Sequence, residues 1–149
     1  MRIFHVFMSA VLLLTGSIAH AQNRTSQVEA NKKIVYDFYR FVWEPADEAA
    51  LMKWLPESYI EHNPRFRNGR TDLANLLRTR RKGQPVKVSD TLHDPPELIV
   101  AEGELVTWIF KRMRKDPKDP NQQYESFWFD TFRIRDGKIV EHWDGALRE

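Results

Sequence analysis

The chain has 149 residues, a formal net charge of +2 and no cysteine. This length fits one domain with a substantial hydrophobic core. The lack of cysteine excludes disulfides, thiol catalysis and lipid attachment to cysteine, and the small net charge favours neither nucleic acid nor a membrane surface as a partner.

The first 21 residues have the pattern of a cleavable signal peptide. Arg2 supplies a positive charge, and the apolar run 6–14 is too short to cross a bilayer. Ala19-His20-Ala21 fits a cleavage site flanked by small residues. We therefore expect a periplasmic or secreted protein whose single domain covers residues 22–149 and keeps no stable membrane anchor. The alternative is a retained anchor.

Three helices are expected at the start of this domain. Ser26-Gln27-Val28-Glu29 has the pattern of a capping box, and apolar residues at helical spacing follow it, which predicts a helix over 26–43. Pro45 suits the first turn of a second helix, which ends at Pro56. Thr71 is expected to cap the third helix.

After Gly83 the pattern changes from helices to strands. The expected strands cover 86–92, 97–101, 105–113, 124–135 and 138–144. Helices followed by an antiparallel sheet indicate the α+β class. A strongly curved sheet that closes over the three helices would form a cone with one internal pocket.

The last two strands place a carboxylate inside the expected core. Asp136-Gly137 is typical of a two-residue hairpin turn, which pairs Asp130 with Trp143 on the apolar, inward face. His142 and Asp144 then fall on the opposite face, at a rim or a dimer interface, unless a β-bulge shifts the register. A buried carboxylate needs a partner or a proton, so Asp130 is either a satisfied structural acid or a functional one.

Three stretches of the domain carry a family resemblance. They are YIEHNP at 59–64, AEGEL at 101–105 and FDTFRIRDGKIVEHWD at 129–144. Together they resemble the SnoaL-like branch of the nuclear-transport-factor-2-like (NTF2-like) superfamily, over essentially the whole mature chain. The resemblance implies the cone-shaped α+β fold, a homodimer packed through the sheet, and aldol-type ring closure without a cofactor. The superfamily also contains members that only bind ligands.

The resemblance also implies roles for individual residues. Asp130 corresponds to the strand aspartate that acts as acid and base in the cyclase, and to the protonated oxyanion-hole aspartate of ketosteroid isomerase. His62, or Asn63 next to it, falls near the general base of the isomerase. The strand 105–112 departs from the cyclases because it contains no histidine.

The sequence therefore predicts a cofactor-free acid/base enzyme for a small hydrophobic carbonyl compound, of the isomerase, aldol-type cyclase or dehydratase type. His62 would remove a proton α to the carbonyl, and protonated Asp130 would stabilise the enolate. The alternatives are a binding module without catalysis and an interaction domain whose own aromatic rings fill the pocket. The histidines lack metal-ligand spacing, so no metal is expected. The residues expected to line the pocket are Phe38, Tyr59, Asn63, Trp108, Trp128 and Trp143.

Overall fold

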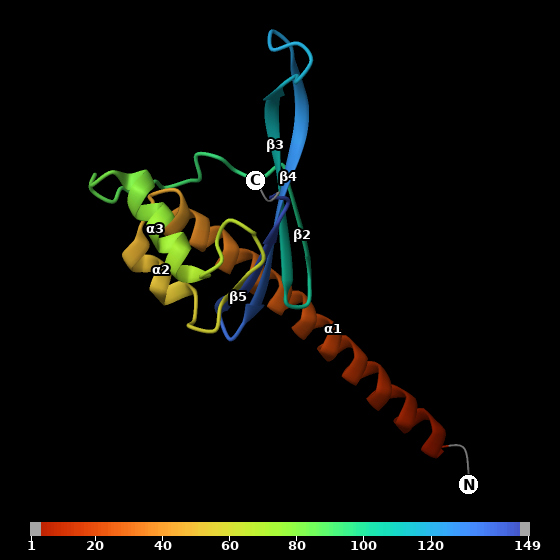
Figure 1. Cartoon of the computed structure of the whole chain (residues 1–149). Coiled ribbons are helices and arrows are strands. Elements are labelled where there is room, and N and C mark those ends of the chain that lie inside the picture. The colour runs from red at the N-terminus through yellow and green to blue at the C-terminus, as the bar shows by residue number, and fades with distance from the viewer. Residues whose placement is uncertain (1–3, 147–149) are drawn as a thin grey trace.

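The structure is a computed structural model that describes the backbone of residues 4–146 and the side chains of residues 21–146. Helices cover one face of a single five-stranded sheet, and the first helix extends well beyond this body toward the N-terminus (Figure 1). Residues 1–3 of the expected signal peptide lie outside the described residues. Among the described residues, no helix is both long enough and apolar enough to span a membrane.

The first helix is longer than the sequence pattern predicts. Helix α1 runs over Phe4–Phe38 and continues directly into the π-helix η1, Tyr39–Trp43. Because α1 passes through residue 26, the expected capping box is wrong: the Ser26 hydroxyl donates to the Asn23 carbonyl oxygen at 2.8 Å, within the helix.

Two short helices complete the helical layer. Helix α2, Glu48–Trp54, is capped by Asp47, whose carboxylate accepts the backbone N–H groups of residues 49 and 50 at 3.0 Å. Helix α3, Arg70–Arg81, begins after Gly69 and not at Thr71. Gly69 has a φ of +54°, and a Cβ there would lie 3.3 Å from the Tyr59 carbonyl oxygen, so glycine suits this helix start.

The sheet has the strand order β1-β5-β4-β3-β2. All neighbouring strands are antiparallel except β1, which is parallel to β5. The expected α+β class is confirmed. The strands are β1 Ile60–Glu61, β2 Leu98–Glu102, β3 Leu105–Lys115, β4 Gln123–Arg135 and β5 Lys138–Asp144.

The strand expected over 86–92 is wrong. This stretch, together with His93 after it, is hydrogen-bonded to side chains of residues 40 and 44 and not to a neighbouring strand. The Arg40 guanidinium donates to the Ser89 carbonyl oxygen at 2.7 Å. Nearby, the Glu44 carboxylate accepts the backbone N–H groups of His93 and Asp94 at 2.9 and 3.0 Å. The segment therefore lies over the end of α1 and η1 and not at the sheet edge.

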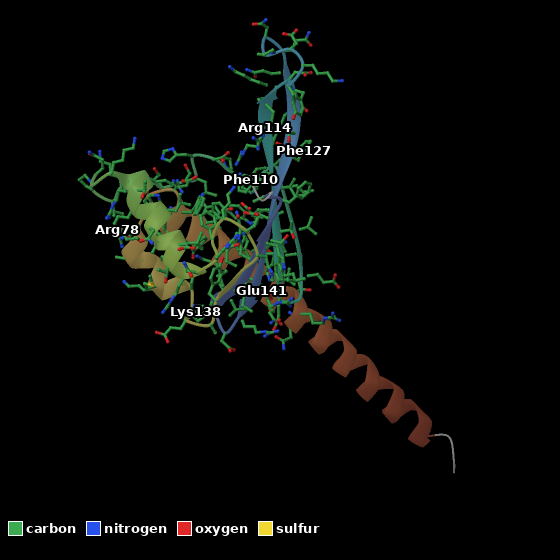
Figure 2. All side chains as sticks on the ribbon, viewed as in Figure 1. Arg78, Phe110, Arg114, Phe127, Lys138 and Glu141 are labelled. Atoms are coloured by element: carbon green, nitrogen blue, oxygen red, sulfur yellow. The ribbon has the colours of Figure 1, made fainter. Side chains whose placement is uncertain are left out.

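The hydrophobic core lies between the helices and the inner face of the sheet. Phe110, only 1% exposed, points into this core, whereas Phe127 on the opposite face of the sheet is 48% exposed (Figure 2). Burial of this apolar surface is the main favourable contribution to folding. The largest fully buried side chains are Trp108, Phe110, Leu51, Leu55, Leu77, Ile134 and Ile139.

A β-bulge changes the register of the last hairpin. The turn is as predicted, with positive φ at both Asp136 and Gly137, and Ile134 pairs with Ile139. The next pair joins residue 133 to residue 141, so Val140 is an extra residue on β5.

This one-residue shift decides which side chains meet on the inner face. Asp130 pairs with Asp144, and Phe132 pairs with His142. The predicted faces of β5 beyond the bulge are therefore wrong, because a shift by one residue turns every following side chain to the other side of the sheet. His142 and Asp144 share the face of Asp130, whereas Trp143 does not.

Candidate functional site

A cavity of about 250 Å³ lies between η1, the start of α3 and the inner face of the sheet. We call it the inner cavity. Its lining combines an apolar wall with a cluster of titratable and polar groups on one side. The apolar lining residues are Phe38, Trp43, Phe66, Leu73, Trp128, Phe132 and Ala146, and the polar ones are Tyr39, Glu61, Asn63, Arg65, Asp130, His142 and Asp144.

Asp130 is held by hydrogen-bond donors on both of its oxygens. The Tyr39 hydroxyl donates to Oδ2 at 2.5 Å, and the Trp128 indole N–H donates to Oδ1 at 2.7 Å. Burial and the adjacent charge of Asp130 raise the pKa of Tyr39 well above its ordinary value, so the phenol keeps its proton. Behind it, Trp108 stacks on the Tyr39 ring at 4.4 Å, and so supports Tyr39 instead of lining the cavity as expected.

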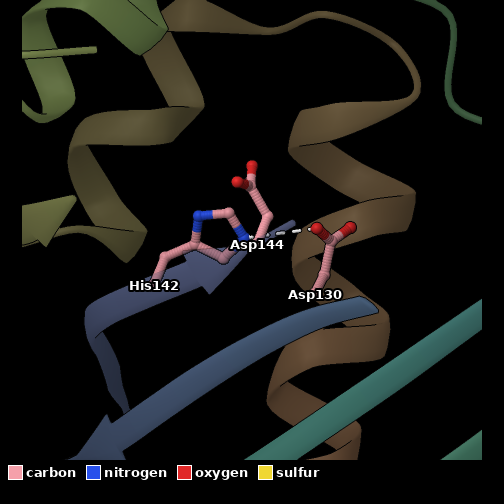
Figure 3. A group of neighbouring side chains, drawn as sticks. All are labelled: Asp130, His142 and Asp144. Carbon is pink, nitrogen blue, oxygen red and sulfur yellow. Dashed lines mark ion pairs between the residues drawn. The ribbon is translucent and has the colours of Figure 1, made fainter. Parts of the chain in front are cut away.

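His142 lies between two carboxylates. Its Nδ1 is 2.9 Å from Glu61 Oε1, and its Nε2 is 3.4 Å from Asp130 Oδ1 (Figure 3). The ring also stacks on Phe132, with centroids 4.8 Å apart. Burial lowers the pKa of His142, but the contacts with Asp130 and Glu61 outweigh it and raise the pKa to about 9. The imidazole is therefore a cation at neutral pH.

Glu61 holds the His142 ring in place through its hydrogen bond to Nδ1. Its side chain has 0% exposed surface, and its carboxylate also accepts the Tyr59 hydroxyl at 2.7 Å and the Asn63 backbone N–H at 2.9 Å. Burial raises the pKa of Glu61, but these hydrogen bonds and the contact with His142 lower it below the ordinary value. Tyr59, expected in the pocket wall, thus lies behind Glu61 and outside the cavity lining.

Hydrogen bonds fix the position of Asp144 next to Asp130 and His142. The Asn63 side-chain amide donates to Asp144 Oδ2 at 2.7 Å, and the Ala146 backbone N–H donates to Oδ1 at 2.9 Å. The side-chain oxygen Oδ1 of Asn63 accepts the backbone N–H of Arg65 at 2.9 Å. Asn63 therefore both shapes the turn after β1 and orients a carboxylate of the inner cavity.

His62 lies away from the cavity, contrary to the role expected for it beside Asp130. Residues 61 and 62 point to opposite sides of β1, and Glu61 takes the inward one. His62 is 42% exposed, stacks on Trp143 with centroids 4.9 Å apart, and is hydrogen-bonded through Nε2 to Glu141 Oε1 at 2.8 Å. Trp143 is therefore part of the outer surface and does not line the cavity either.

No family model and no curated protein matches this sequence. Solved structures do match it. AclR, a candidate hydroxylase from Streptomyces galilaeus, is 20% identical, with a TM-score of 0.54 over 78% of each chain. An NTF2-like protein from Burkholderia xenovorans is 24% identical, with a TM-score of 0.51 over 78% of this chain and 88% of that one.

A candidate polyketide cyclase from Acidithiobacillus ferrooxidans is 20% identical, with a TM-score of 0.50 over 77% of this chain and 86% of that one. The chain has the NTF2-like fold. At these identities the likeness establishes the fold alone, so the expected NTF2-like fold is confirmed. Function on an NTF2-like fold has to be argued from the site itself.

The sequence pattern did not identify two residues of the site, Tyr39 and Glu61. Tyr39 is one of several aromatic residues on the first helical segment, and its pattern does not distinguish a hydrogen-bond donor from a core ring. Glu61 lies within the motif at 59–64, where alternation along a strand places it opposite His62. That alternation is the signal that could have identified Glu61 as the inward group.

The polar cluster also has some features of a metal site. Asp130, His142 and Asp144 each offer one ligand atom, and these atoms lie within 4.8 Å of one another. They fit a cation poorly, because His142 would first have to lose its proton and the carboxylate oxygens already accept hydrogen bonds. The expected lack of a metal stays a prediction.

Proposed function

We propose that this NTF2-like protein is a cofactor-independent acid/base enzyme that enolises a small hydrophobic carbonyl compound in the inner cavity. The observation that carries the proposal is the position of His142 at the cavity wall, where Nδ1 contacts Glu61 and Nε2 lies next to Asp130. This places a proton donor and a proton acceptor within 3.4 Å of each other. Isomerisation, aldol-type cyclisation and dehydration all begin with this step.

The proposed roles differ from those expected from the sequence. Asp130 accepts hydrogen bonds from Tyr39 and Trp128 and faces the His142 cation, an environment suited to a carboxylate. Asp130 therefore removes the proton α to the carbonyl, and His142 Nε2 donates its proton to the carbonyl oxygen, which gives a neutral enol. The reverse transfers at another carbon, or attack of the enol on a second carbonyl, complete the reaction.

The apolar wall of the inner cavity supports this chemistry. Phe38, Phe66, Leu73 and Phe132 give the cavity an apolar lining next to the polar groups. A hydrophobic ring in contact with them would displace water, and both proton transfers would then take place in a region of low dielectric constant. The cavity of about 250 Å³ limits the reacting part of the substrate to a small molecule or ring.

Exchange of α-hydrogen for deuterium tests the proposal without knowledge of the product. A panel of cyclic ketones and lactones in D₂O is followed by proton NMR with and without the protein. We expect catalysed exchange for at least one compound, and a loss of about 10²- to 10⁴-fold in Asp130→Asn. His62→Gln, a change outside the cavity, should keep the wild-type rate.

The same assay distinguishes the main alternative. A protein that binds members of the panel in the inner cavity but catalyses no exchange would be a binding module, and the enzyme proposal would be wrong. An unchanged exchange rate in Asp130→Asn would equally remove Asp130 from the mechanism.

We also propose that two copies of the chain associate through the outer face of the sheet. Ile109 pairs with Leu98 on one side and with Phe129 on the other, so this face is apolar across three strands. Leu98 and Phe129 are 54% and 49% exposed, and Val100 is 53% exposed. A continuous exposed apolar face of this kind marks an interaction surface. Export to the periplasm or beyond remains the prediction from residues 1–21.

A further inference from the structure

A second, larger cavity of about 550 Å³ adjoins the inner one. We call it the outer cavity. The two share Tyr39, Trp43, Arg65, Trp128 and Asp130 in their linings, so they lie side by side. The rest of the outer lining is strongly charged, unlike the apolar wall of the inner cavity.

The carboxylates of the outer cavity already have partners within the protein. Glu44 accepts the backbone N–H groups of His93 and Asp94 at 2.9 and 3.0 Å. Asp94 in turn accepts two hydrogen bonds from the Arg112 guanidinium, at 3.0 and 2.6 Å. Neither Glu44 nor Asp94 forms an ion pair with Arg80 or Arg114 within the described part of the chain.

Arg80 is one of the outer-cavity arginines that have no acidic partner within the described part of the chain. Its guanidinium carbon lies 4.6 Å from the centre of the Trp43 ring, at the junction of the two cavities, and Arg80 has no ion pair among residues 21–146. Its neighbours on α3 differ, because Arg78 and Arg81 both contact Glu48, at 3.8 and 2.6 Å. Arg80 is exposed to solvent at the rim of the cavity, and the partial burial of its guanidinium lowers its pKa.

A second arginine faces the same space from the sheet. Arg114 on β3 lines the outer cavity and likewise has no acidic partner within the described part of the chain. Figure 2 shows Arg114 on β3 beyond Phe110, and the label of Arg78 marks helix α3, which also carries Arg80. Two guanidinium groups from opposite sides of the cavity therefore face it without an acid.

We propose that the outer cavity binds the carboxylate of a substrate whose apolar, carbonyl-bearing part occupies the inner cavity, with Arg80 as the main contact and Arg114 as the second. The substrate class is then a hydrophobic keto acid. A guanidinium stacked on an indole presents its N–H groups at its edge, which matches the two oxygens of a carboxylate. This inference rests on the proposed function only in assigning the apolar part of the ligand to the inner cavity.

A pair of probes that differ in charge alone tests the inference by binding, without turnover. Isothermal titration calorimetry compares 1-naphthylacetate with neutral 1-naphthylacetamide on the wild-type protein, Arg80→Gln and Arg78→Gln. We expect the wild type to prefer the acid about tenfold, and Arg80→Gln to lose that preference through weaker acid binding alone. Arg78→Gln removes the same charge from the same helix and should bind both probes like the wild type.

Each other result overturns the inference. Equal binding of both probes by the wild type, an unchanged preference in Arg80→Gln, or the same loss in Arg78→Gln would exclude a specific carboxylate site at Arg80. Binding of neither probe would exclude the site together with the inner cavity as a ligand site. An Arg80-dependent preference for the acid, without deuterium exchange on the ketone panel or on hydrophobic keto acids, would leave the inference standing and refute the enzyme proposal alone.

Discussion

Glu61 and His142 face each other across the parallel pair β1–β5, with Glu61 Oε1 2.9 Å from His142 Nδ1. The carboxylate has no exposed surface, so its charge is balanced mainly by the imidazole and its other hydrogen-bond donors. The pairing fixes which ring nitrogen faces the sheet edge. Nε2 is thereby left to face Asp130 and the inner cavity, which is the arrangement required of a proton donor.

Replacement of Glu61 tests how this pair sets the charge of His142. In Glu61→Gln the amide keeps a hydrogen bond but the negative charge is lost, whereas burial of the imidazole remains. We expect the pKa of His142 to fall from about 9 by about one unit or more. Titration of the His142 ring protons by NMR measures this shift directly.

Glu141→Gln is the matched control for that experiment. Glu141 contacts His62 and Arg133 on the outer face of the sheet, at 2.8 Å each. The change should leave the His142 titration unaltered. A His142 pKa that is the same in Glu61→Gln and in the wild type would show that Glu61 does not hold the imidazolium.

The raised pKa of His142 also makes stability depend on pH. The folded protein binds this proton up to about pH 9, whereas an unfolded chain releases it near pH 6.5. The stabilisation is therefore fully present below about pH 6.5 and is lost as the pH rises through about 9. For this mostly buried group the shift corresponds to at most about 3 kcal/mol.

Urea unfolding at pH 6 and at pH 9.5 measures this contribution. The wild type should exceed His142→Gln in free energy of unfolding by more at pH 6 than at pH 9.5, since only the wild type gains from the bound proton. Use of the difference between the two proteins removes the titration of the groups that do not contact His142. A gap that stays constant over this range would contradict a raised pKa of His142.

The inward direction of His142 and Asp144 depends on a β-bulge, which the alternation of side chains along the strands does not reveal. Alternation along β4 and β5 predicts the faces correctly up to Ile139, and the hairpin turn at 136–137 is as expected. The extra residue Val140 then turns His142 and Asp144 inward. A bulge arises from the twist and packing of the whole sheet, which a local reading of the two strands does not include.

Local sequence signals predict some elements correctly, whereas contacts between distant residues decide the structure of others. Strand β5 matches its expected bounds and α2 ends just before Pro56, because turn residues and proline act locally. The segment 86–92 has the composition of a strand but is held by Arg40 and Glu44. Contacts between residues almost 50 positions apart override such a local preference.

Metal removal should leave the protein unchanged. The cluster of Asp130, His142 and Asp144 would have to release a proton and give up hydrogen bonds to take a divalent cation. We therefore expect the same melting temperature in EDTA and in added Zn²⁺ or Mg²⁺ at pH 7, and the same deuterium exchange. A clear rise in melting temperature with Zn²⁺ that is absent in His142→Gln would instead identify a metal site.

Introduction of a charge into the outer face of the sheet tests the proposed dimer. Phe129 is 49% exposed at the centre of this face, so a lysine there keeps the strand intact but costs desolvation in an interface. We expect the wild type to sediment as a dimer and Phe129→Lys as a monomer in analytical ultracentrifugation. Met52→Lys, which also replaces an exposed apolar residue (46%) but on α2, should remain a dimer. A monomeric wild type, or a Phe129→Lys protein that stays dimeric, would exclude association through this face.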